Sequence, residues 1–257
     1  MEFAPAIETV GKSPPQARPR DRWGPWASLA WGVPLAVAMI STQTLGAIGF
    51  LRLWRYLHPG HPIALASVAS NGAVLAFSLA VSVPLVLALL AFVVRLSRVS
   101  MSEYLALKWP SWREMGKGIA ALAGVLLATA LLAALTGQET PDFMADTFAT
   151  ARAAGLLPLF VFSFVFLAPL QEELLFRGYF FRGFAPALGV WPTILITAGV
   201  WSLTHAQYEW FFVGEIFALG LVFGWLRARY GSTILTTGLH ASVNGLALLE
   251  VALLSGS

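Results

Sequence analysis

Six residues in the second half of the chain could together perform acid–base chemistry. They are Glu172, Glu173, Arg177, His205, His240 and Asn244. A carboxylate can take a proton from water, while imidazole and amide groups can position that water or stabilise a developing negative charge. Each of the six lies within or at the end of a stretch that is otherwise apolar. Ionisable groups are costly in such surroundings, so these residues are candidates for function rather than ordinary surface charges.

The spacing of the first three residues predicts different roles for the two glutamates. Glu173 and Arg177 are four residues apart, so on a helix they are neighbours and can form an ion pair. Glu172 points about 100° away from Glu173, and the position one turn after it is Phe176, which cannot pair with it. We therefore expect Glu173 and Arg177 to form a structural clamp, and Glu172 to keep a carboxylate free for chemistry.

The two histidines extend this candidate site to two further helices. His205 follows Trp201 by four residues, and Asn244 follows His240 by four, so each pair lies on one helix face. A turn is expected near Gly189, with Glu172 17 residues before it and His205 16 residues after it. Antiparallel helices would then place both side chains at the same depth, about 25 Å from the turn.

His240 lies less deep by the same reasoning. It follows the expected turn at 230–231 by nine to ten residues, which is about 15 Å of helical rise. A tilt of its helix or an offset of the preceding loop would close the difference.

The elements that must hold these residues are membrane-spanning helices. Of the 257 residues, 58% are hydrophobic and only 11% are charged, whereas soluble domains have about 25% charged residues. Long runs without any Asp, Glu, Lys or Arg occur at 23–51, 56–94, 118–138, 153–171, 183–208 and 230–249. Such continuous runs must satisfy their backbone groups as helices. We predict an all-α, polytopic transmembrane helical bundle of seven or eight spans, in which the helix after the break at 58–62 begins at about Ile63.

Charge placement predicts domain organisation and orientation. Residues 1–22, rich in proline and basic residues, are expected to be a disordered cytoplasmic tail. N-terminal transmembrane helices and an interfacial loop follow at 23–152, and a catalytic transmembrane core at 153–257. With the N-terminus inside, the segments 1–22, 95–117, 177–182 and 227–229 hold 13 of the 16 basic residues. The positive-inside rule therefore favours an integral membrane protein with a cytoplasmic N-terminus, in the plasma membrane if the source is bacterial.

The composition also excludes several classes of chemistry and partner. The chain has no cysteine, which excludes thiolate nucleophiles and disulfide scaffolds. Its net charge is only +3 and it has no long basic tract, so we expect no nucleic-acid partner. The oligomeric state stays open.

At this point the motifs resemble a known family. Glu172-Glu173-x-x-x-Arg177, an aromatic-x-x-x-His at 201–205 and His240-x-x-x-Asn244 look like the three motifs of the CPBP intramembrane proteases. That family includes the CAAX prenyl endopeptidases and the bacteriocin-processing (Abi) proteins. The resemblance covers roughly 155–250. The second motif usually has Phe where this chain has Trp201, which replaces one aromatic residue by another.

The resemblance implies an integral-membrane endopeptidase acting on peptide or protein substrates in or at the bilayer, including CAAX-type substrates. Glu172 would activate water with the help of His205, while His240 and Asn244 would stabilise the oxyanion. Zinc held by Glu172, His205 and His240 would suit this chemistry, and a metal-free mechanism with the same residues is equally compatible.

The residues leave two other function classes open. One is a proton-coupled transporter in which buried Glu and His side chains relay protons, although the sequence shows no repeated halves of the kind many transporters have. The other is a non-catalytic membrane scaffold with the same fold.

Overall fold

The computed structural model describes residues 23–139 and 141–254. Within these ranges the chain is almost entirely helical and has no β-strand, which confirms the predicted all-α bundle. The expected disordered tail, residues 1–22, lies outside the described residues. In chain order the elements are α1 (Pro25–Leu57), a 3-10 turn (Leu65–Ser67), α2 (Gly72–Leu96), α3 (Met101–Tyr104), α4 (Trp112–Thr136), α5 (Asp142–Ala153), α6 (Leu157–Phe162), a π-helical segment (Ser163–Leu167), α7 (Ala168–Glu173), a second π-helical segment (Leu174–Phe180), α8 (Phe181–Leu188), α9 (Val190–Leu203), α10 (Trp210–Tyr230) and α11 (Thr233–Leu254).

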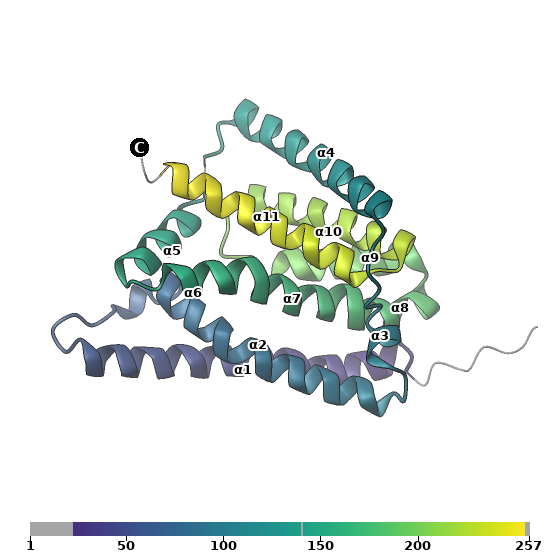
Figure 1. The fold of residues 1–257 in the computed structure, drawn as a ribbon, viewed down its shortest axis with the longest axis horizontal. Helices are drawn as coiled ribbons and strands as arrows, with labels where there is room; N and C mark the ends of the chain where they lie inside the picture. Colours follow the sequence, from purple (N-terminus) through teal and green to yellow (C-terminus); the bar gives the residue numbers. More distant parts are fainter. Residues whose placement is uncertain (1–22, 140, 255–257) are drawn as a thin grey trace, which may run out of the picture.

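Six helices in the described part of the chain are long and apolar enough to cross a bilayer. They are α1, α2, α4, the continuous helix Leu157–Leu188, α10 and α11. α9 is apolar too but has only 14 residues, a rise of about 21 Å against a hydrocarbon thickness of about 30 Å. Together these helices form an elongated bundle (Figure 1). The number of complete crossings, seven or eight, stays a prediction.

The second span begins later than the sequence predicted. α2 starts at Gly72 rather than near Ile63, because Asn71 caps it. The Asn71 side-chain oxygen accepts hydrogen bonds from the backbone N–H groups of Ala73 and Val74, both at 3.1 Å. Asparagine is among the strongest N-cap residues, so the preceding residues stay in the connection and include only the short 3-10 turn.

The helix Leu157–Leu188 is continuous but contains two π-helical segments. A π-helical turn holds an extra residue, which disturbs the regular pairing of backbone carbonyls and often accompanies a functional site. Two of these carbonyls accept from side chains of other helices. Asn244 Nδ2 donates to the Phe164 oxygen at 2.8 Å, and Arg227 Nε donates to the Arg177 oxygen at 2.9 Å. The helix therefore reaches from one end of the bundle to the other without a break, and positive φ at Gly189 (+84°) forms the predicted turn into α9.

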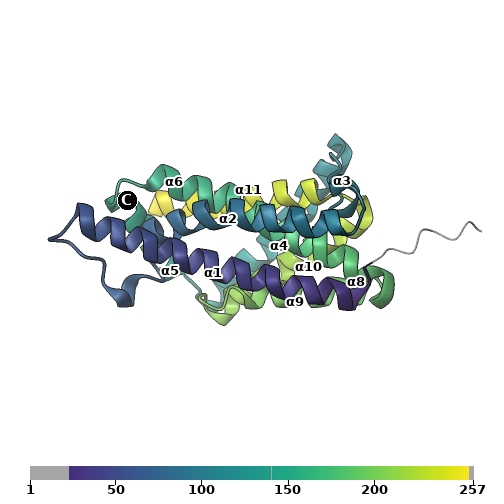
Figure 2. The same ribbon diagram turned by 90° about the horizontal axis from the view of Figure 1, so that it is seen from below.

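α9 and α10 pack closely through two glycines of α10. A Cβ atom at Gly220 would lie 2.9 Å from the Cβ of Ala198, and one at Gly224 would lie 3.0 Å from the Cγ2 of Ile194. Small residues at this spacing let helix backbones approach each other in a membrane. α1 packs along α2 and contacts α8 near its own start (Figure 2).

The start of α11 is fixed by the loop after α3. Thr233 Oγ1 donates to the Leu105 oxygen at 2.7 Å, and the Thr233 N–H donates to the Ala106 oxygen at 3.0 Å. The Ser232 hydroxyl donates to the Lys108 oxygen. These bonds set the level at which α11 begins, and therefore the level of His240 two turns later.

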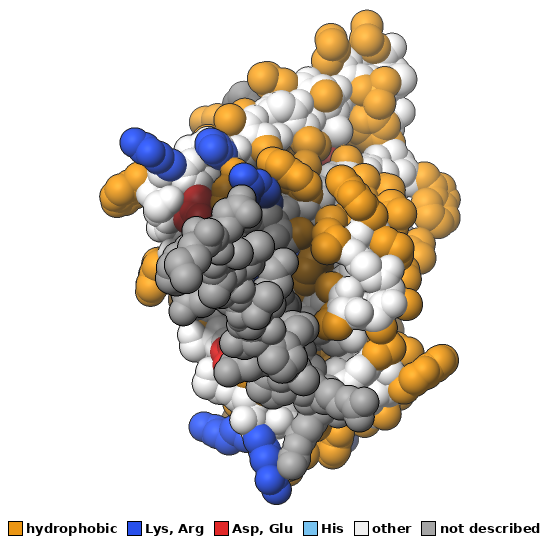
Figure 3. Space-filling model, turned by 90° about the vertical axis from the view of Figure 1, so that its right-hand side faces the viewer, with side chains coloured by type: hydrophobic (Ala, Val, Ile, Leu, Met, Phe, Trp, Pro, Cys, Tyr) orange, Lys and Arg blue, Asp and Glu red, His pale blue; other side chains and the backbone are white. Residues whose placement is uncertain are grey.

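One end of the bundle collects most of the described basic side chains. The starts of α1, α4 and α11, the ends of α2 and α10, and both α3 and α8 lie at this end (Figure 1), and Figure 3 looks onto it. Arg177 is an exception, because its side chain is completely buried inside the bundle. The positive-inside rule includes Arg177 among the basic residues that orient the chain, but its burial removes it from that set. The other described basic residues of the segments predicted to lie inside are Arg95, Arg98, Lys108, Arg113, Lys117, Arg182, Arg227 and Arg229.

Candidate active site

Glu173 and Arg177 form the ion pair that their spacing predicted. Arg177 Nη1 lies 3.0 Å from Glu173 Oε1, and both side chains are fully buried. Arg177 Nη2 also donates to the backbone oxygen of Gly220 at 3.2 Å. The pair therefore joins the long helix to α10. A buried ion pair is stable only when further hydrogen bonds and good geometry compensate its lost hydration.

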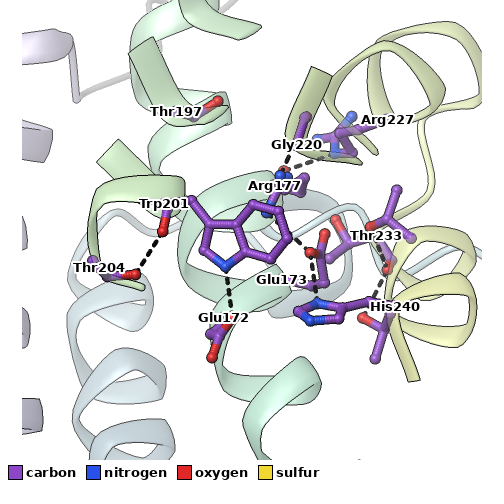
Figure 4. Close-up of polar contacts among 12 residues, drawn as sticks. Glu172, Glu173, Arg177, Thr197, Trp201, Thr204, Gly220, Arg227, Thr233 and His240 are labelled. Atoms are coloured by element: carbon purple, nitrogen blue, oxygen red, sulfur yellow. Dashed lines mark hydrogen bonds and ion pairs between the residues drawn. The ribbon is translucent and has the colours of Figure 1, made fainter. Parts of the chain in front are cut away.

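Aromatic rings cover the guanidinium of Arg177. Its Cζ lies 4.4 Å from the ring centroid of Trp201 and 5.5 Å from that of Phe223. Arg177 is thus held by the carboxylate of Glu173, by the carbonyl of Gly220 and by two aromatic rings, in contact with α9 and α10 at once (Figure 4). Cation–π contacts of this kind strengthen when water is excluded.

His240 joins the same cluster from α11. Its Nδ1 lies 3.2 Å from Glu173 Oε1, its ring stacks on Phe223 at 5.5 Å, and it meets the edge of Trp201 at 5.1 Å. Since an ionised carboxylate only accepts hydrogen bonds, Nδ1 must be the protonated nitrogen. His240 therefore reaches the long helix, as convergence required, but its partner there is Glu173 rather than the carboxylate proposed for chemistry.

Glu172 lies on the other side of Trp201. The indole Nε1 of Trp201 donates to Glu172 Oε2 at 2.6 Å, and the carboxylate is partly exposed. Figure 4 shows the indole between Glu172 and the buried Glu173–Arg177 pair. Glu172 therefore has a hydrogen-bond partner that the sequence did not predict, while its second oxygen, Oε1, accepts no hydrogen bond from the described residues.

His205 lies in the turn after α9 rather than inside the helix. Its Nδ1 is 3.0 Å from the backbone oxygen of Trp201, and its partly exposed ring meets the Trp201 ring edge-on at 5.4 Å. Because a carbonyl can only accept, Nδ1 carries the proton and Nε2 presents a lone pair when the ring is neutral. His205 and Glu172 thus flank Trp201, which agrees with the equal depth predicted for them.

Asn244 is engaged elsewhere. Its Nδ2 donates to the carbonyl of Phe164 in the first π-helical segment. The structure thus gives Asn244 a role in holding that segment, and its expected role at an oxyanion stays a prediction.

The proposed metal ligands do not form a compact set. In residues 23–139 and 141–254, no group of three or more His, Asp or Glu side chains is placed to hold a metal ion. The histidine tautomers suit metal binding, because each Nδ1 donates and leaves Nε2 available. The three side chains are not grouped closely enough to share one ion. The reaction proposed for this site therefore involves no metal, and zinc stays a prediction.

Two contributions to the site were missed in the sequence. Trp201 was treated only as an aromatic residue, whereas its N–H bond to Glu172 distinguishes it from Phe. Tyr208, in the turn before α10, donates its hydroxyl to Met144 Sδ at 3.1 Å. Burial, together with the charges of Glu172 and Glu209, raises the pKa of the Tyr208 phenol above its usual range. A Tyr two residues before a helix of spanning length carries no sequence signal that would have placed it near Glu172.

An apolar groove of about 650 Å³ runs between the long helix and α11. Leu170 and Leu174 line it on one side, and Ala241 and Ser242 on the other. These residues are close neighbours in the chain of Glu173 and His240, so the groove lies against the two helices that carry the site. Trp109, in the loop before α4, also lines it.

Comparison with known families agrees with this arrangement. The Rce1-like family, type II CAAX prenyl endopeptidases, matches residues 153–246. We call residues 153–246 the Rce1-like segment. The Rce1-like segment contains all six candidate site residues, from Glu172 to Asn244, and the resemblance to the CPBP proteases is thereby confirmed.

The similarity to a curated relative covers about half of the chain. An uncharacterised 24.3 kDa protein of Escherichia coli is 31% identical over 134 residues, which cover 51% of this chain and 61% of that protein. The chain thus spans about three fifths of the length of this relative. No solved structure matches the chain significantly.

Proposed function

We propose that this protein is a membrane endopeptidase that hydrolyses peptide bonds of membrane-associated or CAAX-type substrates, with Glu172 as the base that activates water. The observation that carries the proposal is the different placement of the two adjacent glutamates. Glu173 is buried and paired with Arg177 and His240. Glu172 is partly exposed and keeps one oxygen without a partner among the described residues. The similarity of residues 153–246 to the Rce1-like family supports the same activity.

The chemistry follows from the hydrogen bonds already described. A water molecule bound to Glu172 Oε1 transfers a proton to the carboxylate while its oxygen attacks the carbonyl carbon of the peptide bond. His205, whose Nε2 lone pair is available, accepts a hydrogen bond from the second O–H group of this water and so orients the water. The C–N bond then breaks, and Glu172 returns the proton to the leaving amine. The resulting products are a carboxylic acid, which loses its proton to water, and a free amine.

His240 is the side chain best placed to stabilise the oxyanion. Its Nδ1 donates to the buried carboxylate of Glu173, which fixes the orientation of the ring. An imidazolium ring carries an N–H group on both nitrogens, so in that form the Nε2–H of His240 can donate to the negative oxygen of the tetrahedral intermediate. Directed donors of this kind contribute most where water is excluded.

The test is cleavage of a prenylated CAAX-type peptide by purified protein in detergent. The Glu172→Gln variant keeps the shape of the side chain but cannot act as a base, so its rate should fall by about 10³-fold or more. Glu209→Gln is the matched control, because Glu209 is an exposed glutamate close to the site whose side chain caps no helix N–H. Wild-type cleavage by the Glu172→Gln protein would contradict the mechanism.

The natural substrate can be identified in the cells that make the protein. Comparative proteomics of wild-type and Glu172→Gln cells should show a C-terminal or leader fragment that disappears in the variant.

No observation favours the transporter or scaffold alternatives. We also propose a plasma-membrane location with the N-terminus in the cytoplasm, on the basis of the charge distribution.

A further inference from the structure

Trp201 contacts most of the candidate site residues through a single buried side chain. Its side chain is only 1% exposed, yet the indole contacts four polar or charged side chains of the site. The ring face covers Arg177, and the ring edges meet His205 and His240. The single polar atom of the indole donates to Glu172 at 2.6 Å.

We propose that Trp201 is a positioning residue, and that its indole N–H holds Glu172 in the orientation needed for catalysis. This inference rests on the proposed role of Glu172 as the base. The hydrogen bond fixes Oε2, so that Oε1 is the oxygen left to meet water. A charge-assisted bond of this length is among the stronger side-chain hydrogen bonds. Without it, the glutamate side chain would sample other rotamers and lose its fixed direction.

The indole ring system of Trp201 has a second role, in addition to that of its N–H group. It lies between Glu172 and the guanidinium of Arg177 (Figure 4). Arg177 Nε is buried without a hydrogen-bond partner among the described residues, so the guanidinium still has a donor that another carboxylate could use. The indole keeps Glu172 away from this donor, and each carboxylate therefore keeps its own partner. Phenylalanine at position 201 would supply a smaller ring and no donor.

The first experiment separates the donor from the ring by kinetics. Trp201→Phe should lower kcat about tenfold or more, as expected for the loss of one charge-assisted hydrogen bond acting in the reaction step, while KM stays within about twofold. Trp31→Phe is the matched control. Trp31 also packs against the core but stacks on Trp23 rather than on a site residue, so its kcat should equal that of the wild type.

A second variant guards against a simple packing defect. Incorporation of 3-benzothienylalanine at position 201 replaces the indole N–H by sulfur and preserves the bicyclic shape and the contact with Arg177. It should show the same loss of kcat as Trp201→Phe. A wild-type kcat in the benzothienyl protein would overturn the inference, because the ring alone would then be sufficient.

A spectroscopic measurement tests the hydrogen bond independently of activity. The indole N–H resonance of Trp201, assigned by its absence in Trp201→Phe, should shift strongly upfield in Glu172→Gln and remain in place in Glu209→Gln. An unshifted resonance would overturn the inference. If Glu172→Gln is inactive while both Trp201 variants are fully active, the inference fails and the proposed function stands. If Glu172→Gln is fully active, the proposed function fails instead.

Discussion

Glu172 and Glu173 are adjacent in the chain, but their carboxylates meet opposite surroundings. Glu173 faces the bundle interior, where Arg177 and His240 share one of its oxygens. Glu172 faces the turn after α9 and meets the indole N–H of Trp201. The difference arises from a rotation of about 100° per residue along the helix. At this scale, one residue step separates a structural charge from a reactive one.

The buried ion pair makes a prediction about stability. Arg177→Met removes the cation but leaves Glu173 buried, and unpaired buried charges cost about 3–5 kcal/mol. We expect a clearly lower midpoint of thermal unfolding in detergent. Arg182→Met is the control, because Arg182 is partly exposed and its ion pair with Glu103, at 3.7 Å, is of the surface kind. Such pairs contribute little. Equal midpoints for wild type and Arg177→Met would show that the pair is not structural.

At the scale of elements, the sequence predicted the helices better than their ends and irregularities. Runs without charge identify apolar helices because a membrane forces the backbone into that one structure. The start of α2 was missed, because the capping strength of Asn71 outweighed the apolar residues after Pro62. The π-helical segments were also missed, because their carbonyls are satisfied by Asn244 and Arg227, which belong to other helices.

The partners of the site residues depend on how helices rotate against each other. The Glu173–Arg177 pair was predictable because it is local to one helix. The pairing of His240 with Glu173 was not, since it depends on the level set by the loop after α3 and on the rotation of α11. Trp201 and Glu172 meet for the same kind of reason. Single-helix geometry therefore selects the candidate site residues, and only the packed bundle assigns their contacts.

The close packing of α9 on α10 predicts which glycine matters. Alanine at Gly220 would place its Cβ 2.9 Å from Ala198 and 3.2 Å from Trp201 Cε3, so α9 and the indole that it carries must shift relative to α10. We expect Gly220→Ala to lower both the cleavage rate and the unfolding midpoint. Gly214, on the same helix, has open space around it, and Gly214→Ala should be neutral or slightly stabilising. Similar rates for the two variants would contradict this packing account.

At the scale of the whole molecule, the site lies far from both ends of the bundle. Glu172 precedes Leu188, the last residue of α8, by 16 residues, which is about 24 Å of helical rise. The basic side chains gather at that same end (Figure 3). If this end faces the cytoplasm, the positive-inside rule is satisfied, and the loop between α1 and α2 faces the opposite side. The orientation of the bundle therefore determines which compartment each of its two ends faces.

Cysteine labelling tests this orientation directly, because the chain has no cysteine of its own. Gly60→Cys lies in the exposed loop after α1, and Ser102→Cys lies at an exposed position of α3 at the other end. With a membrane-impermeant maleimide on intact cells, we expect labelling of the first variant only. The second should become labelled after permeabilisation, and the cysteine-free parent provides the blank in both cases. The reverse pattern would place the basic end outside, against the positive-inside rule, and would move the N-terminus out of the cytoplasm.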